Sequence, residues 1–294
     1  MSAANIISLK DFPQITLRRY MRNDLLRSLY ARVTDNALFF NAINRRYIKA
    51  LSQLPPPELT EVGKRVVRDL GENGIAFAHI SEFFQPEFFD VIKSTFDTFL
   101  EEFHRLPSSE KGKAVFIDTI HKAHTFSKSD SVSTYCGLPA FASIAAHYMG
   151  LVPRFVGSSF WRTRVAPEND RIYSQLWHRD YNDRMLVKVF LYVSDVGDKE
   201  GYFEYLTQSH WRGLLGCQLD KVGSDGLRVY PNEDELEGCL ANIPVINLST
   251  VQDNCLSGDS TPWHGKPTVI RCQAPKGTLI FADTFGIHRG GHVE

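Results

Sequence analysis

The stretch that decides the fold is Gln175-Leu176-Trp177-His178-Arg179-Asp180, followed by the apolar run Leu186-Val187-Lys188-Val189-Phe190-Leu191-Tyr192-Val193. Residues two apart on a β-strand point to the same face, so a strand here would present the His178 imidazole beside the Asp180 carboxylate. Such a pair is two thirds of the two-histidine, one-carboxylate triad that holds Fe(II) on one side and leaves other coordination positions open.

The third ligand has to come from another part of the chain, and H-x-D alone is a pattern that recurs by chance. His288 is the best candidate, because it closely follows the apolar run Thr278-Leu279-Ile280-Phe281. It comes 108 residues after Asp180, a separation that can bring in a strand from the far side of a barrel. We predict that His178, Asp180 and His288 are the metal ligands and form the catalytic centre.

Several short motifs surround these residues in a fixed order. They are W-H-x-D at 177–180, K-V-F-L-Y-V-S-D-V at 188–196, G-Y-F-E-Y-L at 201–206, S-H at 209–210 and H-R-G-G at 288–291. In this order they resemble the phytanoyl-CoA dioxygenase-like family of Fe(II)/2-oxoglutarate-dependent oxygenases, from about Gly71 to the end of the sequence. The resemblance implies Fe(II), 2-oxoglutarate as co-substrate, O2, and oxidation of a C–H bond with release of succinate and CO2. Asp180 favours hydroxylation, because halogenating members of the family lack this carboxylate.

The fold class that we predict is mainly β with flanking helices: a double-stranded β-helix (jelly roll, cupin-like) with an N-terminal helical layer. Apolar residues at helical spacing predict helices at 58–72, 88–103 and 138–148. Many short strands separated by turn residues are typical of a jelly roll. The predicted strands are 75–80, 113–120, 155–165, 173–178, 186–194, 202–206, 227–230, 243–248, 268–272 and 278–283.

We expect a single oxygenase domain over 1–294. About 1–72 would form an N-terminal helical extension, and about 73–294 the β-helix core with its buttressing helices. Residues 212–265 are rich in glycine and carry an acidic run, so we expect an insertion there. The resemblance places an arginine for the far carboxylate of 2-oxoglutarate on the strand after the distal histidine. The sequence ends six residues after His288, so we expect that closing barrel strand to be cut off.

Other cations are therefore candidates for the co-substrate. Arg164 and Lys188 are predicted to bind 2-oxoglutarate, and Trp177 and Arg162 to contact the substrate. Arg162 and Arg164 share one face of their predicted strand, which is either an outer ion-paired face or an anion clamp. Lys188 interrupts an apolar strand, so it either extends to water at the margin or reaches the pocket.

Composition excludes several classes of function. The formal net charge of −1 argues against a nucleic-acid partner, and no apolar run approaches the length of a membrane span. The N-terminus does not resemble a secretory signal, and five scattered cysteines without C-x-x-C predict reduced thiols. We expect a cytoplasmic protein with a small-molecule substrate and without a nucleic-acid or membrane partner. The sequence leaves the oligomeric state open.

Two other functions stay open at this point. A cupin-like metal-dependent hydrolase or isomerase could use the same triad to hold zinc or manganese and activate water. A non-catalytic barrel could retain the motif and serve as a binding protein. Metal identity and oxygen dependence separate the first alternative from an oxygenase, and a longer reading frame that restores the arginine would weaken the second.

Overall fold

The computed structural model describes about three fifths of the chain. The described residues are 58–105, 116–122, 134–135, 137–165, 171–180, 185–219, 236, 238, 240–250 and 266–294, with Ala42 and Arg45 as single residues. The predicted extension before residue 58 therefore lies outside the described residues, apart from those two, as do the predicted strand 227–230 and most of 212–265.

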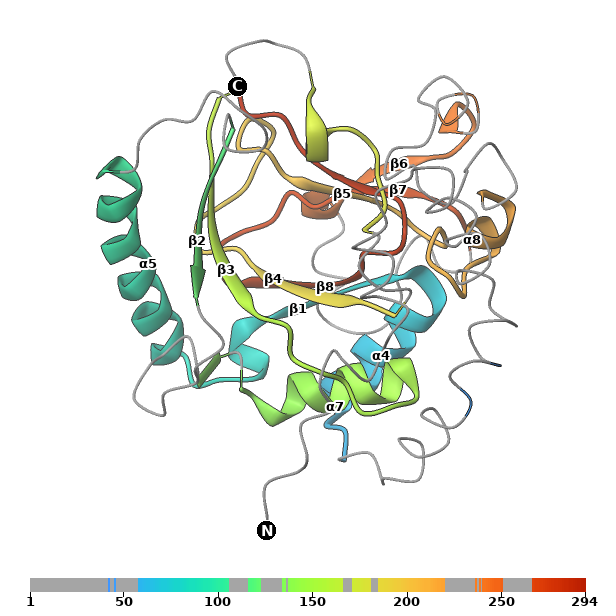
Figure 1. The fold of residues 1–294 in the computed structure, drawn as a ribbon, viewed down its shortest axis with the longest axis horizontal. Helices are drawn as coiled ribbons and strands as arrows, with labels where there is room; N and C mark the ends of the chain where they lie inside the picture. Colours follow the sequence, from blue (N-terminus) through green and yellow to red (C-terminus); the bar gives the residue numbers. More distant parts are fainter. Residues whose placement is uncertain are drawn as a thin grey trace.

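The described elements are short strands with flanking helices (Figure 1). The helices are α4 (Glu61–Asn73), α5 (Glu87–Arg105), α7 (Pro139–Met149) and α8 (Leu214–Leu219), with one-turn 3-10 helices η2 (Ile80–Glu82), η4 (Tyr173–Gln175) and η5 (Leu248–Thr250). The strands are β1 (Ile75–His79), β2 (Ile117–Lys122), β3 (Ser158–Thr163), β4 (Val187–Leu191), β5 (Phe203–Leu206), β6 (Val245–Asn247), β7 (Val269–Arg271), β8 (Thr278–Asp283) and β9 (His288–Gly290).

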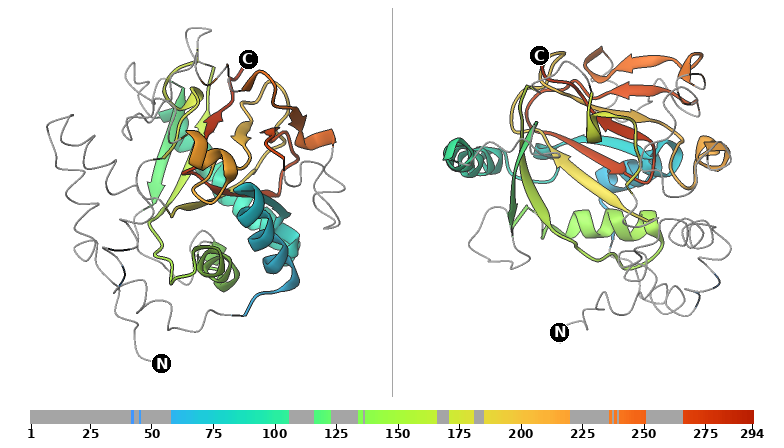
Figure 2. Two further views of the ribbon diagram at one scale, coloured as in Figure 1. Left: turned by 90° about the vertical axis from the view of Figure 1, so that its right-hand side faces the viewer. Right: turned by 45° about the horizontal axis from the view of Figure 1, so that its top comes forward.

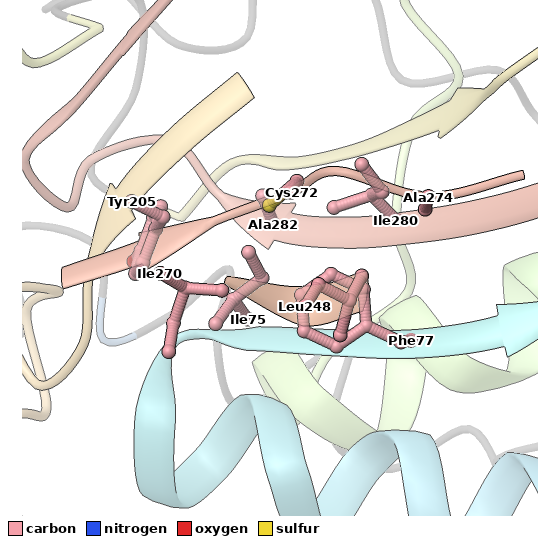
Figure 3. Close-up of a cluster of buried hydrophobic side chains, with 9 residues drawn as sticks. All are labelled: Ile75, Phe77, Tyr205, Leu248, Ile270, Cys272, Ala274, Ile280 and Ala282. Carbon is pink, nitrogen blue, oxygen red and sulfur yellow. The ribbon is translucent and has the colours of Figure 1, made fainter. Parts of the chain in front are cut away.

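Two sheets pack face to face around the core. One has the order β1-β8-β4 and is antiparallel, and the other has the order β6-β7-β5-β9, in which only β6 and β7 run parallel. Figure 3 shows the apolar cluster between them, to which both sheets contribute. Its buried members are Ile75, Phe77, Tyr205, Leu248, Ile270, Cys272, Ala274, Ile280 and Ala282. Burial of this much apolar surface is the main force that holds the sheets together.

Helices α4 and α7 cover the other face of the three-stranded sheet (Figures 1 and 2). Val66 and Leu70 of α4 pack with Ile144 of α7 against alternate residues of β1 and β8. Every residue of β8 is buried, because one face of the strand meets the sheet core and the other meets the helices. This explains why its sequence, Thr-Leu-Ile-Phe-Ala-Asp, lacks the polar alternation of a half-exposed strand.

Strands β2 and β3 form a separate antiparallel pair. Helix α5 lies on the side of this pair away from the other strands (Figure 1). Phe160 of β3 packs against Phe96 and Phe99 of α5, with ring centroids 6.0 and 4.7 Å apart. The face of β3 that carries Phe160 is therefore the outer face.

The structure confirms a mainly β fold with flanking helices; the jelly-roll topology stays a prediction. The prediction of a strand over 173–178 is wrong, because this stretch forms η4 and then makes a single isolated bridge at His178. The stretch 212–265, expected as an insertion, contributes β6 to the four-stranded sheet. No described helix has the length and apolar character needed to cross a membrane.

Candidate metal centre

The structure brings the three predicted ligands together. One ligand atom each of His178, Asp180 and His288 lies within 4.8 Å of the other two, the only such group of three His, Cys, Asp or Glu side chains among the described residues. The rings of the two histidines are 4.3 Å apart between centroids, and His288 Nε2 lies 3.8 Å from Asp180 Oδ2. Such a group has the donor types and the spacing of a mononuclear metal site.

Backbone hydrogen bonds, and not a regular strand, hold the H-x-D segment. His178 and His288 exchange two backbone N–H···O hydrogen bonds of 2.9 Å each, and Asp180 N donates to Thr284 O over 2.8 Å. The segment is therefore attached to the loop and strand that carry the third ligand. Its first and third residues still point to the same side, so the predicted pairing of imidazole and carboxylate is kept although the predicted strand is not.

Both imidazoles are set in the tautomer that a metal needs. His178 Nδ1 lies 2.9 Å from Leu176 O, and His288 Nδ1 lies 2.8 Å from Gly286 O. A carbonyl oxygen can only accept, so each Nδ1 must carry the proton and donate it. Each Nε2 then keeps its lone pair for a metal, the arrangement in which protein carbonyls orient ligating histidines.

The charges at the centre also suit a cation. Burial lowers the pKa of His288, so its imidazole is neutral at pH 7. Burial alone would raise the pKa of Asp180, but the charge of Lys188 and the hydrogen bonds from Lys188 and Thr284 outweigh it and lower this pKa below its ordinary value. The carboxylate is therefore ionised, and its Oδ2 lies 2.6 Å from Lys188 Nζ. A carboxylate and neutral imidazoles are the protonation states that metal binding requires.

A buried network shapes the turn between β8 and His288. Asp283 Oδ1 accepts from Phe285 N over 3.0 Å, and Asp283 Oδ2 accepts from the hydroxyl of Tyr148 over 2.5 Å. The hydroxyl of Tyr205 donates to Asp283 O over 2.9 Å and leaves no room for a side chain at Gly286, where a Cβ would lie 2.0 Å from that oxygen. Because Gly286 O orients His288, this network determines the position of the third ligand.

This network has almost no signature in the sequence. Asp283, Tyr148 and Tyr205 are each almost completely buried, yet they come from three separate elements. The one local signal was a carboxylate at the end of a fully apolar strand. Burial raises the pKa of Asp283 to about 7, so the environment disfavours its charge.

Of the four other predicted site residues, only Lys188 lies at the triad. Arg162 Nη2 and Arg164 Nε lie 2.6 and 3.2 Å from Asp118, on the face of β3 that packs against α5. Arg162 and Arg164 therefore belong to an outer ion-paired face, which was the first of the two alternatives. Neither of them lies at the metal centre. Trp177 points to the opposite side from His178 and stacks on Arg289, 4.3 Å from ring centroid to guanidinium carbon.

His210, the histidine of the S-H motif, has a structural role. It is buried, and its Nε2 lies 3.3 Å from Gly71 O. Burial lowers its pKa to about 4, so it is neutral at pH 7 and ties the loop after β5 to helix α4.

No family model matches the chain, and no curated protein sequence matches it. Among solved structures, the chain is similar to the epimerase SnoN, whose crystal structure is a complex with Fe3+, alpha ketoglutarate and nogalamycin RO. The identity is 14%, the alignment covers 79% of this chain and 77% of that one, and the TM-score is 0.42. At that TM-score the likeness carries no argument for function, which has to come from the triad itself.

Proposed function

We propose that this chain is an Fe(II)- and 2-oxoglutarate-dependent oxygenase that hydroxylates a C–H bond of a small molecule, with release of succinate and CO2. The observation that carries the proposal is the cluster of His178, Asp180 and His288, in which each Nδ1 donates to a backbone carbonyl and the carboxylate is ionised. Two histidines and one carboxylate on one side of an ion are the ligand set of non-haem Fe(II) oxygenases. When bound, iron supplies the redox chemistry by which O2 oxidises the co-substrate and the substrate.

Lys188 is the residue that we assign to the co-substrate. It lies on β4 with its Nζ beside Asp180, and its side chain is 34% exposed, so an anion can reach it. A metal ion and Lys188 compete for the same carboxylate. Once a metal neutralises Asp180, the ammonium group is available to a carboxylate of 2-oxoglutarate.

Aromatic side chains on the same side favour a substrate with an apolar part. The ring of Phe203 lies 5.5 Å from that of His288, Phe190 lies 5.0 Å from Phe203, and Trp161 lies 6.3 Å from Phe190. These rings extend from the metal centre toward Trp161, which is 47% exposed. Apolar contacts of this kind suit a C–H bond better than a charged or strongly hydrated group.

The test is anaerobic addition of Fe(II) and then 2-oxoglutarate to the purified protein, with detection of a visible metal-to-ligand charge-transfer band. We expect a band that is absent in His178→Ala and retained in His147→Ala, a matched change on helix α7. Iron binding without a band would indicate a metal site that does not use 2-oxoglutarate, as in a hydrolase. Absence of iron binding would indicate a non-catalytic barrel.

A further inference from the structure

The outer face of the four-stranded sheet carries three arginines around one buried glutamate. Glu204 lies in the middle of the sheet on β5 and is 1% exposed. Its cross-strand neighbours are Arg271 on β7 and Arg289 on β9, and Arg171 reaches it from the segment before η4. The nitrogen–oxygen distances to the Glu204 carboxylate are 3.4 Å from Arg271, 2.5 Å from Arg289 and 3.6 Å from Arg171.

One carboxylate cannot neutralise three guanidinium groups. Within the part of the chain that the structure describes, Glu204 is the only ion-pair partner of these arginines. Asp198, near the same face, accepts from Gln273 Nε2. The excess of positive charge affects Arg171, because burial and the charges of Arg289 and Arg271 lower the pKa of its guanidinium group. Cations that repel one another in a partly buried place favour the binding of an anion.

The three arginines are not equivalent. Arg289 is engaged on both sides, by Glu204 and by the ring of Trp177, and its side chain is 18% exposed. Arg271 and Arg171 contact different oxygens of Glu204 and are 40% and 31% exposed. Their guanidinium groups therefore converge on one carboxylate and still reach solvent, where their remaining N–H donors can bind another acceptor.

From this arrangement we infer a second ligand site: Arg171 and Arg271 bind a tetrahedral oxyanion on the outer face of the four-stranded sheet, with Arg289 and Glu204 fixing their positions. Arginine suits this ligand because its planar group donates two parallel hydrogen bonds to phosphate-type oxygens. Inorganic phosphate and the phosphoryl group of a larger metabolite share this chemistry. The site is separate from the proposed iron centre, since His288 and Arg289 point to opposite faces of β9.

The experiment measures thermal unfolding of the metal-free full chain in phosphate and in chloride at equal ionic strength. A ligand that binds only the folded state stabilises it, and we expect phosphate to raise the midpoint by about 2–4 °C when it is well above its dissociation constant. Arg271→Gln and Arg171→Gln should lose this shift, and the exposed Arg154→Gln should keep it. AMP in place of phosphate distinguishes the sources, because a larger shift with AMP indicates a phosphorylated metabolite.

Two further measurements keep the inference testable if an arginine variant does not fold. Calorimetric titration of the wild-type protein should show phosphate binding, and its absence would overturn the inference. Lys188→Met should keep the phosphate shift. A shift lost in Lys188→Met and kept in Arg271→Gln would assign the phosphate to the metal centre and would also overturn it. Because metal-free protein is used, failure of the iron proposal does not affect either outcome.

Discussion

His288 and Arg289 are consecutive residues of β9, yet their side chains enter opposite kinds of environment. His288 joins a second histidine and a carboxylate in a group that can receive a cation. Arg289 joins a cluster in which cations exceed anions. The segments on both sides of β9 show the same alternation. Trp177 and Glu204 contact Arg289 on the outer face, whereas His178 and Tyr205, the residues that follow them, lie on the face of His288.

This comparison shows how a sheet separates incompatible charges. Successive side chains of a strand point to opposite faces, so one sheet can hold a metal site inside and an arginine cluster outside without contact between them. Each site then has its own local support: backbone carbonyl groups orient the two imidazoles, and Glu204 holds the arginines. The two sites should therefore respond independently to mutation.

The largest expected effect comes from breaking the outer cluster. Glu204→Ala leaves three guanidinium groups around a buried position without a carboxylate, and removal of one partner of a buried ion pair costs about 3–5 kcal/mol. We expect urea unfolding to show a loss of that size, partly recovered in phosphate. Glu58→Ala, at an exposed position, should change little. A loss below about 1 kcal/mol for Glu204→Ala, as for a surface pair, would mean that water already screens these charges.

A change on the inner face separates the two sites directly. His288→Ala removes one of the three proposed metal ligands, and we expect Co(II) or Fe(II) affinity to fall at least about 100-fold, which corresponds to about 3 kcal/mol. The phosphate shift should remain, because Arg289 lies on the other face. Arg271→Gln should instead lose the phosphate shift and keep the metal affinity. If either variant lost both responses, the two faces would be coupled and the comparison would not hold.

The cluster of His178, Asp180 and His288 could be predicted from the sequence because few residue types suit a metal site and because local motifs mark them. H-x-D precedes an apolar strand, and His288 follows the apolar strand β8, so both signals are readable over a few residues. The conformation of the H-x-D segment could not be predicted, since it depends on backbone hydrogen bonds to Thr284 and His288, more than 100 residues away. The pattern of two-residue spacing gave the correct pairing for a segment that is not a strand.

Features that depend on which face of a strand is inward could not be predicted. Alternation places Arg162 and Arg164 on one face of β3, but only the packing of α5 on Phe160 shows that this face is outer. The cluster around Glu204 draws on four segments and leaves no local pattern. β6 lies within the predicted strand 243–248, but its parallel pairing with β7 at the edge of the four-stranded sheet could not be predicted from the sequence.

The buried network behind the metal centre predicts a dependence of stability on pH. The pKa of Asp283 is about 7 in the folded protein and near 4 for an unfolded chain, so between these values the folded state holds a proton that the unfolded state has released. The free energy of unfolding must then fall as pH rises through this window. We expect the difference between wild type and Asp283→Asn to fall by about 2–3 kcal/mol from pH 4.5 to 6.5.

Equilibrium unfolding of both proteins at several pH values measures this difference, and groups present in both, such as His210, cancel. A difference that stays constant would mean that Asp283 is ionised throughout, held so by the two donors Tyr148 and Phe285 N. Since Asp283 shapes the turn before His288, the metal affinity of Asp283→Asn should also fall, by about 10-fold or more.

The smallest effect concerns Lys188, which lies beside Asp180 on the inner face. Lys188→Met removes the ammonium group that we assign to the co-substrate, and loss of a charged hydrogen bond of this kind weakens 2-oxoglutarate binding about 10-fold, or about 1.4 kcal/mol. Metal binding should be retained or slightly stronger, because Lys188 no longer competes for Asp180. Titration of 2-oxoglutarate into the Fe(II)-loaded protein measures the effect, with the exposed Lys64→Met as control. Unchanged 2-oxoglutarate affinity would assign the carboxylate to another cation. A loss of 2-oxoglutarate affinity with the phosphate shift intact would show that Lys188 and the arginines of the outer face serve different anions.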